Sequence, residues 1–282
     1  MTWHKHGKRY NKDKLVHPSD GEAWKYFDQQ HPEEAREARN VRIAIATDGF
    51  NPYGMTSSPY SCWPVFFIPF NLPPGQLMQR KNIFVSLTIL GLEYSGKNLS
   101  VFMQPLVDDL EDSWVNGTRT YDQDTRTNFE MRVWFHYSMH DLPAFALFCG
   151  WCTHGKMPCP VCMQALIFIW LKKGGKYSAF DQHRQFLPEG HPFRCDKKNF
   201  RKGIVVHDKV DVPVFNGEAI LHELNALQTK ALGDGYEGYG EWHNWTHIAG
   251  LMKLPYSDSL HNHRGTSCRF STTTIPTSFG VL

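Results

Sequence analysis

The sequence lacks a hydrophobic segment long enough to span a membrane. Its apolar runs, such as Pro64–Phe70 and Ala165–Leu171, are far shorter than the roughly 20 residues that a membrane helix needs. The first residues, MTWHKHGKRYNKDK, are basic and polar with no apolar stretch behind them, unlike a secretory signal peptide. We therefore expect no membrane partner and no export signal.

Glycine, proline and net charge are also low. The 22 Gly and 17 Pro among 282 residues are too few for a fibrous or largely disordered chain. A formal net charge of +2 excludes a uniformly basic coat for nucleic acid but allows local basic patches. Hydrophobic residues, by contrast, make up 41% of the chain, enough for a core without disulfide or metal staples. The seven cysteines are an odd number and cannot all pair within the chain.

Residues 41 to 139 predict an α/β fold, with mixed α and β elements. Segments rich in β-branched and aromatic residues predict three consecutive strands, over 41–47, 62–70 and 82–90. Apolar residues at three- and four-residue steps predict an amphipathic helix over 101–115, and a fourth strand is predicted over 129–139. A three-strand meander followed by a helix and a further strand implies a mixed sheet with helices packed against it.

Outside this region the patterns are weaker. A short helix is predicted over 21–29, where Ser19 and Glu22 resemble a capping box. Residues 203–217 predict a loop or an edge strand, and 218–232 a helix. The last 22 residues contain eight Ser or Thr, no acid and no apolar periodicity, and are expected to be unstructured.

Two aspartates follow predicted strands, at positions where α/β sheets tend to hold their chemistry. Asp48 comes after the first strand and Asp141 after the fourth, 93 residues later. If they converge, their carboxylates could hold Mg²⁺, which prefers carboxylate oxygens and keeps water and phosphate ligands. The alternative is conformational: Asp48 caps a turn and Asp141 precedes Leu-Pro for backbone reasons. A further acidic cluster on 101–115 is most simply a solvated helix face.

Four cysteines form two CxxC pairs. The spacing of Cys159 and Cys162 is typical of zinc ligands, and distant histidines would have to complete the site. His243, His247, His261 and His263 could do so only if folding brings them back. Cys149 and Cys152 could suggest a redox motif, but the sequence before them resembles a helix interior, which favours a structural role.

The segment 171–202 is strongly basic, with nine Lys or Arg and three acids. Its aromatic residues and positive charge are typical of a nucleic-acid contact, although a solvated insertion is an equally good interpretation. The candidate DNA-binding residues are Lys172, Lys173, Lys176, Lys197, Lys198, Arg201 and Lys202.

Several ordered segments resemble a known family. They are MTWHKHGKRY, HPSDGEAWKYFDQQHP, RNVRIAIATDGFNPYG, SSPYSCWPVFFIPFNLPP, VFMQPLVDDLEDSWVNG, HDLPAFALFCGWCTHGKMPCPVC, HRQFLPEGHPFR and HNWTHIAGLMKLPY. Together they are similar to the plant CACTA-type (En/Spm-like) DNA transposases over about residues 1–256. The DGFNP and CPVC blocks are the most distinctive.

The resemblance implies an RNase H-like catalytic core that cuts transposon ends with metal ions and then transfers the strand. Asp48 matches the first catalytic acid and Asp141 resembles the second, so a two-metal Mg²⁺ site is implied. Cys159 and Cys162 resemble the pair that holds a structural Zn²⁺. The implied partners are transposon-end and target DNA, with full-length transposase subunits, in the nucleus.

The same resemblance implies a division of the chain. Residues 1–40 would be an N-terminal flank, 41–162 a partial RNase H-like core, 163–256 an insertion and 257–282 a divergent tail. The likeness ends after Tyr256, before the third acid that family members carry, and the DNA-binding part expected upstream is absent. Family members also commonly have a Ser-containing stretch in place of Cys149–Cys152. We therefore expect a transposon-derived fragment with an incomplete catalytic site.

Three hypotheses follow for the function. The first is a DDE/D-type transposase that cleaves phosphodiester bonds and has little activity by itself. The second is a non-catalytic protein that binds DNA or transposase subunits. A redox protein that uses Cys149 and Cys152 is the third and is placed below both.

Overall fold

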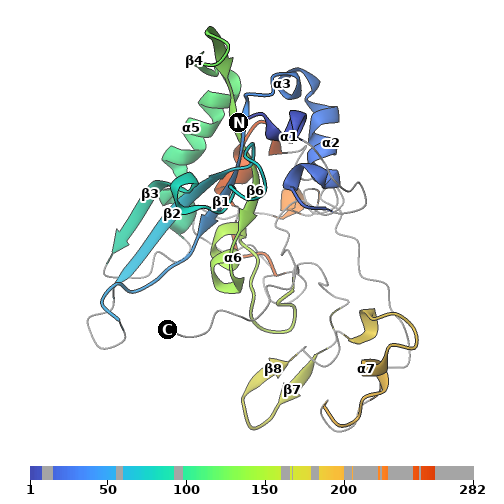
Figure 1. Ribbon diagram of the computed structural model, residues 1–282. Helices are drawn as coiled ribbons and strands as arrows, with labels where there is room; N and C mark the ends of the chain where they lie inside the picture. The colour runs from blue at the N-terminus through green and yellow to red at the C-terminus, as the bar shows by residue number, and fades with distance from the viewer. Residues whose placement is uncertain are drawn as a thin grey trace.

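The chain folds around a four-stranded mixed sheet with helices on both of its faces (Figure 1). The computed structural model describes residues 1–7, 15–54, 60–91, 98–159, 166, 168–178, 184–199, 205, 222, 224–227, 244–247 and 249–257. No helix in this described part has both the length and the apolar character of a membrane span.

The sheet has the strand order β3-β2-β1-β6. Strands β1 (Val41–Thr47), β2 (Ser61–Pro69) and β3 (Phe84–Gly91) form an antiparallel meander. Strand β6 (Val133–Met139) then pairs with β1 in parallel. The predicted mixed α/β fold is confirmed, and the bounds predicted for the first strand are those observed.

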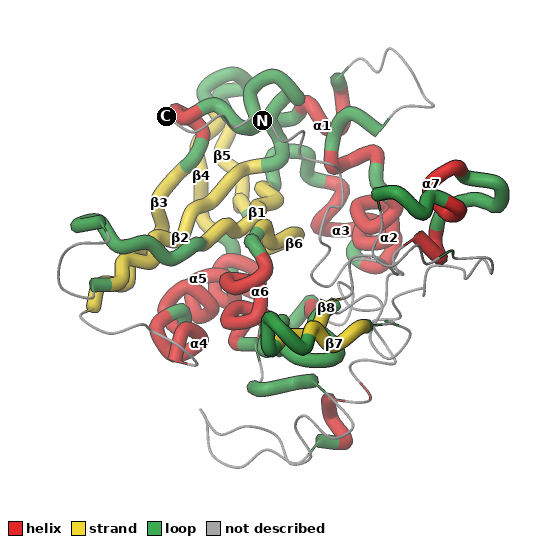
Figure 2. Tube along the Cα trace, turned by 90° about the horizontal axis from the view of Figure 1, so that it is seen from below, coloured by secondary structure: helices red, strands yellow, loops and turns green. Residues whose placement is uncertain are grey.

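Three helices lie together on one side of the sheet (Figure 2). They are α4 (Leu99–Phe102), α5 (Gln104–Val115) and α6 (Leu142–Cys149). Their buried apolar residues, which include Leu106, Leu110 and Phe145, form the main core with Ile43 and Ile45 of β1.

The single helix predicted over 101–115 was wrong in its start. It is two helices, α4 and α5, separated at Met103. Pro105 lies in the first turn of α5, where its missing N–H breaks no helical hydrogen bond, so this position suits the beginning of a new helix.

The opposite face is covered from the N-terminal side. Helices α1 (Trp3–His6), η1 (Pro18–Asp20), α2 (Glu22–Gln30) and α3 (Pro32–Arg36) precede the sheet. Trp24 of α2 packs with Ala44 and Ile68, and the buried guanidinium of Arg42 lies 3.9 Å from the centre of its ring. Arg42 also forms an ion pair with Asp28, so its charge is not left unpaired.

The short helix predicted over 21–29 is confirmed as α2, but the proposed capping box was wrong. Gly21 is the residue that precedes α2, and it supplies no side-chain cap. Ser19 belongs to η1, where its hydroxyl oxygen lies 2.7 Å from Nδ1 of His17, so this side chain is engaged one turn earlier.

A hairpin that the sequence did not predict separates α5 from β6. Its strands are β4 (Thr118–Asp122) and β5 (Thr127–Met131). The strand predicted over 129–139 was therefore wrong as a single element, because its first residues pair with β4 rather than with the main sheet. Arg132 marks the change: its backbone N–H donates to Asn40 at 2.8 Å and its guanidinium donates to the Trp114 and Val115 carbonyls.

The chain beyond α6 contributes four short elements to the described structure. They are β7 (Ile169–Leu171), β8 (Lys176–Ser178), α7 (Pro192–Cys195) and η7 (Gly250–Lys253). The predictions for 203–217, for 218–232 and for the C-terminal tail fall largely or wholly outside the described residues.

Residues 244–257 return to the core. Leu251, Leu254 and Tyr256 are buried in the main apolar cluster, and the Tyr256 hydroxyl accepts a hydrogen bond from the Phe135 N–H of β6 at 3.0 Å. Because β6 is an edge strand of the sheet, this segment covers backbone groups that a neighbouring strand would otherwise have to satisfy.

Candidate catalytic site at the sheet edge

Asp48 and Asp141 directly follow two strands, β1 and β6, that pair in parallel. The last aligned pair is Ala46 with Met139. Extended by two residues past this pair, the register sets Asp48 opposite Asp141. Both acids therefore follow neighbouring strands, about 4.8 Å apart, at the same end of the sheet.

A β-bulge sets this alignment. Before the bulge Ile43 pairs with Phe135, and after it Ala44 pairs with Tyr137, so His136 is the extra residue. Without that residue, the register would place Asp48 opposite His140. The His136 side chain is buried, with its ring centre 5.2 Å from that of Trp24 and 5.6 Å from that of Phe27. The bulge is thus anchored in the core.

The strand β1 is interrupted at Asp48 and resumes its pairing two residues later. Phe50 exchanges backbone hydrogen bonds of 3.0 and 2.9 Å with Cys62 of β2. The antiparallel register places Pro64 opposite Asp48, and proline has no N–H to donate to the ladder. The Asp48 side chain is exposed and accepts a hydrogen bond from the Gly49 N–H at 2.7 Å.

Asp141 is the N-cap of α6. Its Oδ1 accepts a hydrogen bond from the Ala144 N–H at 2.8 Å, and its backbone is extended, as is usual for a cap. The conformational role considered from the sequence is therefore observed for Asp141, which caps α6. Among the described residues, Asp48 accepts a bond only from the next residue and caps no turn. These bonds use one carboxylate oxygen of each acid, and no described residue engages the other oxygen of either side chain.

His140 links the ends of the two strands. Its Nδ1 lies 3.2 Å from the Thr47 carbonyl, an acceptor, so Nδ1 carries the proton. The ring packs on Phe148 of α6, with centres 4.1 Å apart. Burial lowers the pKa of His140 to about 4, against opposing effects of the Thr47 carbonyl and Asp141. The ring is therefore neutral near pH 7. Sequence reasoning missed this residue, whose only signal was its place directly before Asp141.

The chemistry of the two acids suits a hard cation. Mg²⁺ is commonly held by one or two carboxylates and completes its shell with water and substrate phosphate. The described residues contain no group of three or more His, Cys, Asp or Glu side chains placed to hold a metal by themselves. Any cation at this edge would therefore depend on ligands beyond these two carboxylates.

The cysteines are less informative. Cys159 is half-buried and retains a thiol, while Cys162 lies outside the described residues. Cys149 closes helix α6 and is buried, whereas Cys152 is half-buried and retains a thiol, so these two are not joined to each other.

His247 is brought back to the core, but its nitrogens are occupied there. Nδ1 lies 2.9 Å from the Thr246 hydroxyl, and Nε2 lies 2.9 Å from the Leu147 carbonyl near the end of α6. It therefore braces this helix end and is not placed to be a zinc ligand. His243, His261 and His263 lie outside the described residues.

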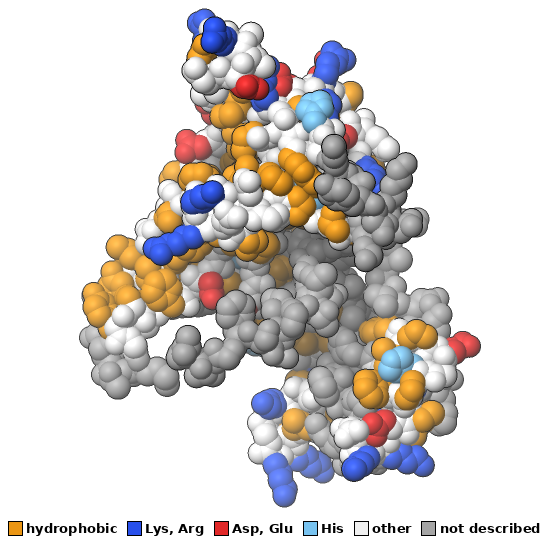
Figure 3. Space-filling model, in the orientation of Figure 1, with side chains coloured by type: hydrophobic (Ala, Val, Ile, Leu, Met, Phe, Trp, Pro, Cys, Tyr) orange, Lys and Arg blue, Asp and Glu red, His pale blue; other side chains and the backbone are white. Residues whose placement is uncertain are grey.

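The predicted DNA-binding lysines that the structure describes are all exposed. Lys172 and Lys173 form the turn between β7 and β8, Lys176 begins β8, and Lys197 and Lys198 follow α7. Figure 3 shows basic side chains gathered where Figure 1 places these elements. Arg201 and Lys202 lie outside the described residues.

Two arginines of the basic segment do not belong to this surface. Arg184 and Arg194 are 4% and 3% exposed and donate to backbone carbonyls, Arg184 to Phe193 and Arg194 to Leu187. They hold the segment around α7 together, so the charge available to a partner is smaller than the composition suggests.

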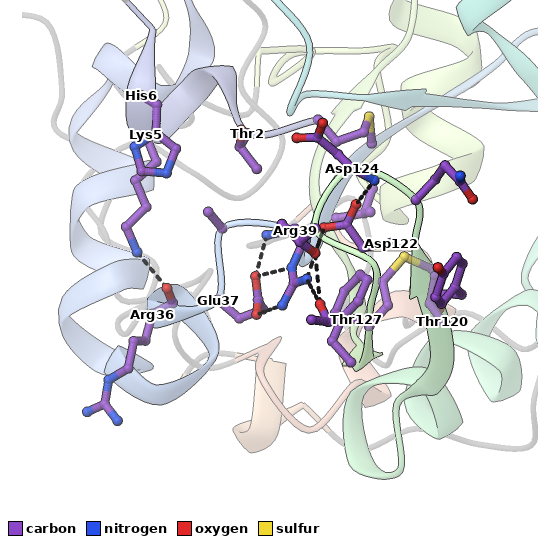
Figure 4. Close-up of a pocket in the computed structure, with 18 residues that line it drawn as sticks. Thr2, Lys5, His6, Arg36, Glu37, Arg39, Thr120, Asp122, Asp124 and Thr127 are labelled. Atoms are coloured by element: carbon purple, nitrogen blue, oxygen red, sulfur yellow. Dashed lines mark hydrogen bonds and ion pairs between the residues drawn. The ribbon is translucent and has the colours of Figure 1, made fainter.

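A cavity of about 860 Å³ lies elsewhere, between α1, the residues before β1 and the β4–β5 hairpin (Figure 4). Arg39 lines this cavity and forms ion pairs of 2.6 Å with Glu37 and 3.0 Å with Asp122, which also line it. Hydrogen bonds from Thr125 and Arg39 lower the pKa of Asp122 to about 2. The cavity adjoins Val41, at the opposite end of β1 from Asp48, so it is separate from the paired acids.

Comparison with known proteins gives one match. Residues 12–227 match the family model described as transposase family tnp2. No curated protein and no solved structure matches significantly. The matched region contains both aspartates, their strands and the exposed lysines. Because it covers well over half of the sequence, the chain belongs to the tnp2 transposase family.

Proposed function

We propose that this chain supplies part of an RNase H-like active site that cleaves DNA at transposon ends and transfers the freed strand. The observation that supports the proposal is the parallel register of β1 and β6, which, extended by two residues past its last pair, sets Asp48 opposite Asp141 at the same end of the sheet. An antiparallel meander with a parallel fourth strand beside β1 is consistent with such a core. CACTA-type membership and a nuclear location are parts of the same proposal.

Each acid has one role in the fold and one in the proposed chemistry. Asp141 uses Oδ1 to cap α6, which fixes its orientation, and Asp48 is held by the Gly49 N–H. The remaining oxygens would hold Mg²⁺, which when bound stabilises charge on the attacking and leaving oxygens of a phosphodiester. His140, neutral and anchored to Thr47, keeps the two strand ends together without adding positive charge.

The test is divalent-metal binding. Mn²⁺ replaces Mg²⁺ as a probe, and its unbound fraction is measured by electron paramagnetic resonance on the full chain. Asp48→Asn and Asp141→Asn are each expected to weaken binding by about ten-fold or more, since each removes a charged oxygen ligand. Asp109→Asn, on the exposed face of α5, is the matched control and should bind like wild type.

Activity is a second readout of the same proposal. We expect the chain by itself to nick DNA weakly or not at all, because no third acid joins the pair among the described residues. Any Mg²⁺-dependent nicking should disappear in Asp48→Asn. Equal Mn²⁺ binding by wild type and by both Asn variants would refute the proposal.

A structural Zn²⁺ held by Cys159 and Cys162 is a separate part of the proposal. It is supported by the spacing of the pair and by the thiol of Cys159. Metal analysis of the purified chain is expected to find zinc, and less of it in Cys159→Ser. Unchanged zinc content in that variant would exclude Cys159 as a ligand.

A second candidate function is DNA or transposase binding without catalysis. It is favoured by the exposed lysines of the β7–β8 turn and of the residues after α7. Salt-sensitive DNA binding should weaken when Lys197, Lys198, Arg201 and Lys202 are changed to Gln. If binding is retained in Asp48→Asn while Mn²⁺ binding is absent even in wild type, this candidate replaces the first.

A further inference from the structure

The β7–β8 hairpin has an aromatic face that no proposed role uses. Trp170 of β7 pairs with Tyr177 of β8. Phe168 lies two residues before Trp170, just before β7 begins. Because side chains alternate along a strand, these three rings share one face. Their centres are 4.7 Å apart for Trp170 and Tyr177, and 5.0 Å for Phe168 and Tyr177.

These rings face outward. Trp170 is 48% exposed and Phe168 is 37% exposed, although both are large apolar side chains. A two-stranded hairpin is marginally stable by itself. The contact between Trp170 and Tyr177 stabilises it, but leaves much of the Trp170 and Phe168 surface in solvent. This face is therefore available to stack on a planar partner.

The turn next to the aromatic face is positively charged. It carries Lys172 and Lys173, and Lys176 follows at the start of β8; all three are exposed, and no acid occurs between Leu166 and Ser178. Gly174 and Gly175 complete the turn, and both of their N–H groups donate to the Leu171 carbonyl, at 3.1 and 2.8 Å. Gly175 has φ +57°, a conformation that glycine adopts readily. The turn thus presents its lysines within a few residues of Trp170.

We propose that the β7–β8 hairpin binds unpaired nucleotides of DNA, with a base stacked on Trp170 and phosphates held by Lys172 and Lys173. Exposed aromatic rings beside lysines are the chemistry by which proteins bind single strands. In a duplex, by contrast, the faces of the bases are already stacked on one another. The choice of DNA rests on the proposed function, whereas the stacking role rests on the hairpin itself.

The test uses fluorescence anisotropy with the full chain in EDTA. One labelled DNA is a blunt duplex, and the other is the same duplex with a single-stranded extension of about ten nucleotides, a length in the usual range for such sites. Wild type is expected to bind the extended DNA more tightly. Trp170→Ala should lower that affinity by about ten-fold and leave the blunt duplex unaffected, while Trp170→Phe should retain most of it.

Two further variants separate stacking from charge. Changing Lys172 and Lys173 to Gln should weaken binding to both DNAs and reduce its salt dependence. Tyr121→Ala is the matched control, because Tyr121 is an aromatic residue of another hairpin and is 54% exposed. It should change neither affinity. If Trp170→Ala does not fold, Phe168→Ala tests the same face.

Three results would overturn the inference. They are unchanged binding of the extended DNA by Trp170→Ala, an equal loss on both DNAs, and binding of anionic phospholipid vesicles that requires Trp170 in place of DNA binding. The assay contains no divalent metal, so its outcome is independent of Mn²⁺ binding at Asp48 and Asp141. Failure of the hairpin inference and failure of the proposed active site are therefore distinguishable.

Discussion

Gly49, directly after Asp48, allows the chain that leaves β1 to pack closely against Trp63 of β2. A Cβ built on it would lie 2.2 Å from two carbons of the Trp63 indole, far closer than van der Waals contact. Trp63 is 3% exposed and its Nε1 donates to the Ser61 hydroxyl at 2.6 Å, so the indole has little room to move. Glycine at this position thus lets the indole pack directly against the backbone that carries Asp48.

Gly49→Ala is therefore expected to destabilise the chain by about 1–3 kcal/mol, the usual cost of overpacking a filled core. It should also weaken Mn²⁺ binding, because the backbone after Asp48 must shift. Urea unfolding and Mn²⁺ titration measure the two effects. Gly75→Ala is the control, since nothing lies within 4 Å of its added Cβ. Equal stability of Gly49→Ala and Gly75→Ala would contradict this account.

The positions of Asp48 and Asp141 just after two strands could be predicted from the sequence, because each follows a segment with a clear β pattern. The support around them could not. His140 hydrogen-bonds to the Thr47 carbonyl, and the Trp63 indole packs against Gly49. Both contacts are with residues distant in sequence. Nothing in the local pattern around either residue indicates what it touches.

At the scale of elements, local patterns predicted the strands of the meander. They did not predict that β5 pairs with β4 whereas β6 pairs with β1. The bulge at His136 alters the register by one residue, and Arg132 separates β5 from β6 through bonds to Asn40 and to the end of α5. Both features arise from pairing between distant segments. Hydrophobic periodicity reports only which side chains are apolar, so it gave one strand where there are two.

The end of helix α6 depends on a second glycine. Gly150 has φ +76° and is the C-cap residue, and a Cβ built on it would lie 2.0 Å from the His247 carbonyl oxygen. Its own carbonyl accepts a hydrogen bond from the Thr246 N–H at 2.7 Å. The helix that begins at Asp141 is thus closed by a segment almost 100 residues later in the chain.

Gly150→Ala is expected to cost more than the strain of a left-handed alanine alone. Gly155 provides that reference, because it has φ +80° and nothing lies within 4 Å of its added Cβ. Gly155→Ala should cost about 1 kcal/mol, and Gly150→Ala about 2–4 kcal/mol, since the His247 backbone must also move. Urea unfolding followed by circular dichroism measures both. Similar losses in the two variants would mean that the contact with His247 is unimportant.

At the scale of the whole molecule, residues 244–257 contact α5, β6 and the residue after α6, none of which is near them in sequence. Trp245 forms a bridge with Trp151 after α6, η7 packs near α5, and Tyr256 covers the edge of β6. The lysine-bearing hairpin therefore lies in sequence between two segments that are fixed to the same core. No pattern in the sequence of this late segment indicates these contacts.

Tyr256 provides a test of this closure that also has a pH dependence. Tyr256→Phe leaves the Phe135 N–H without its acceptor, and should cost about 1–2 kcal/mol at pH 7. Burial raises the pKa of the Tyr256 hydroxyl above its ordinary value of 10. The unfolded chain therefore releases this proton first as the pH rises, so the stability that depends on the neutral hydroxyl is present below pH 10 and is lost above it.

The difference between wild type and Tyr256→Phe should accordingly be constant from pH 7 to 9 and shrink above pH 10. Urea unfolding at several pH values measures it, and Tyr121→Phe, at an exposed hydroxyl, serves as the control. Only the difference between wild type and Tyr256→Phe reports on Tyr256. A difference that stays constant through pH 10.5 would mean that the segment ending at Tyr256 is not held against β6 in solution.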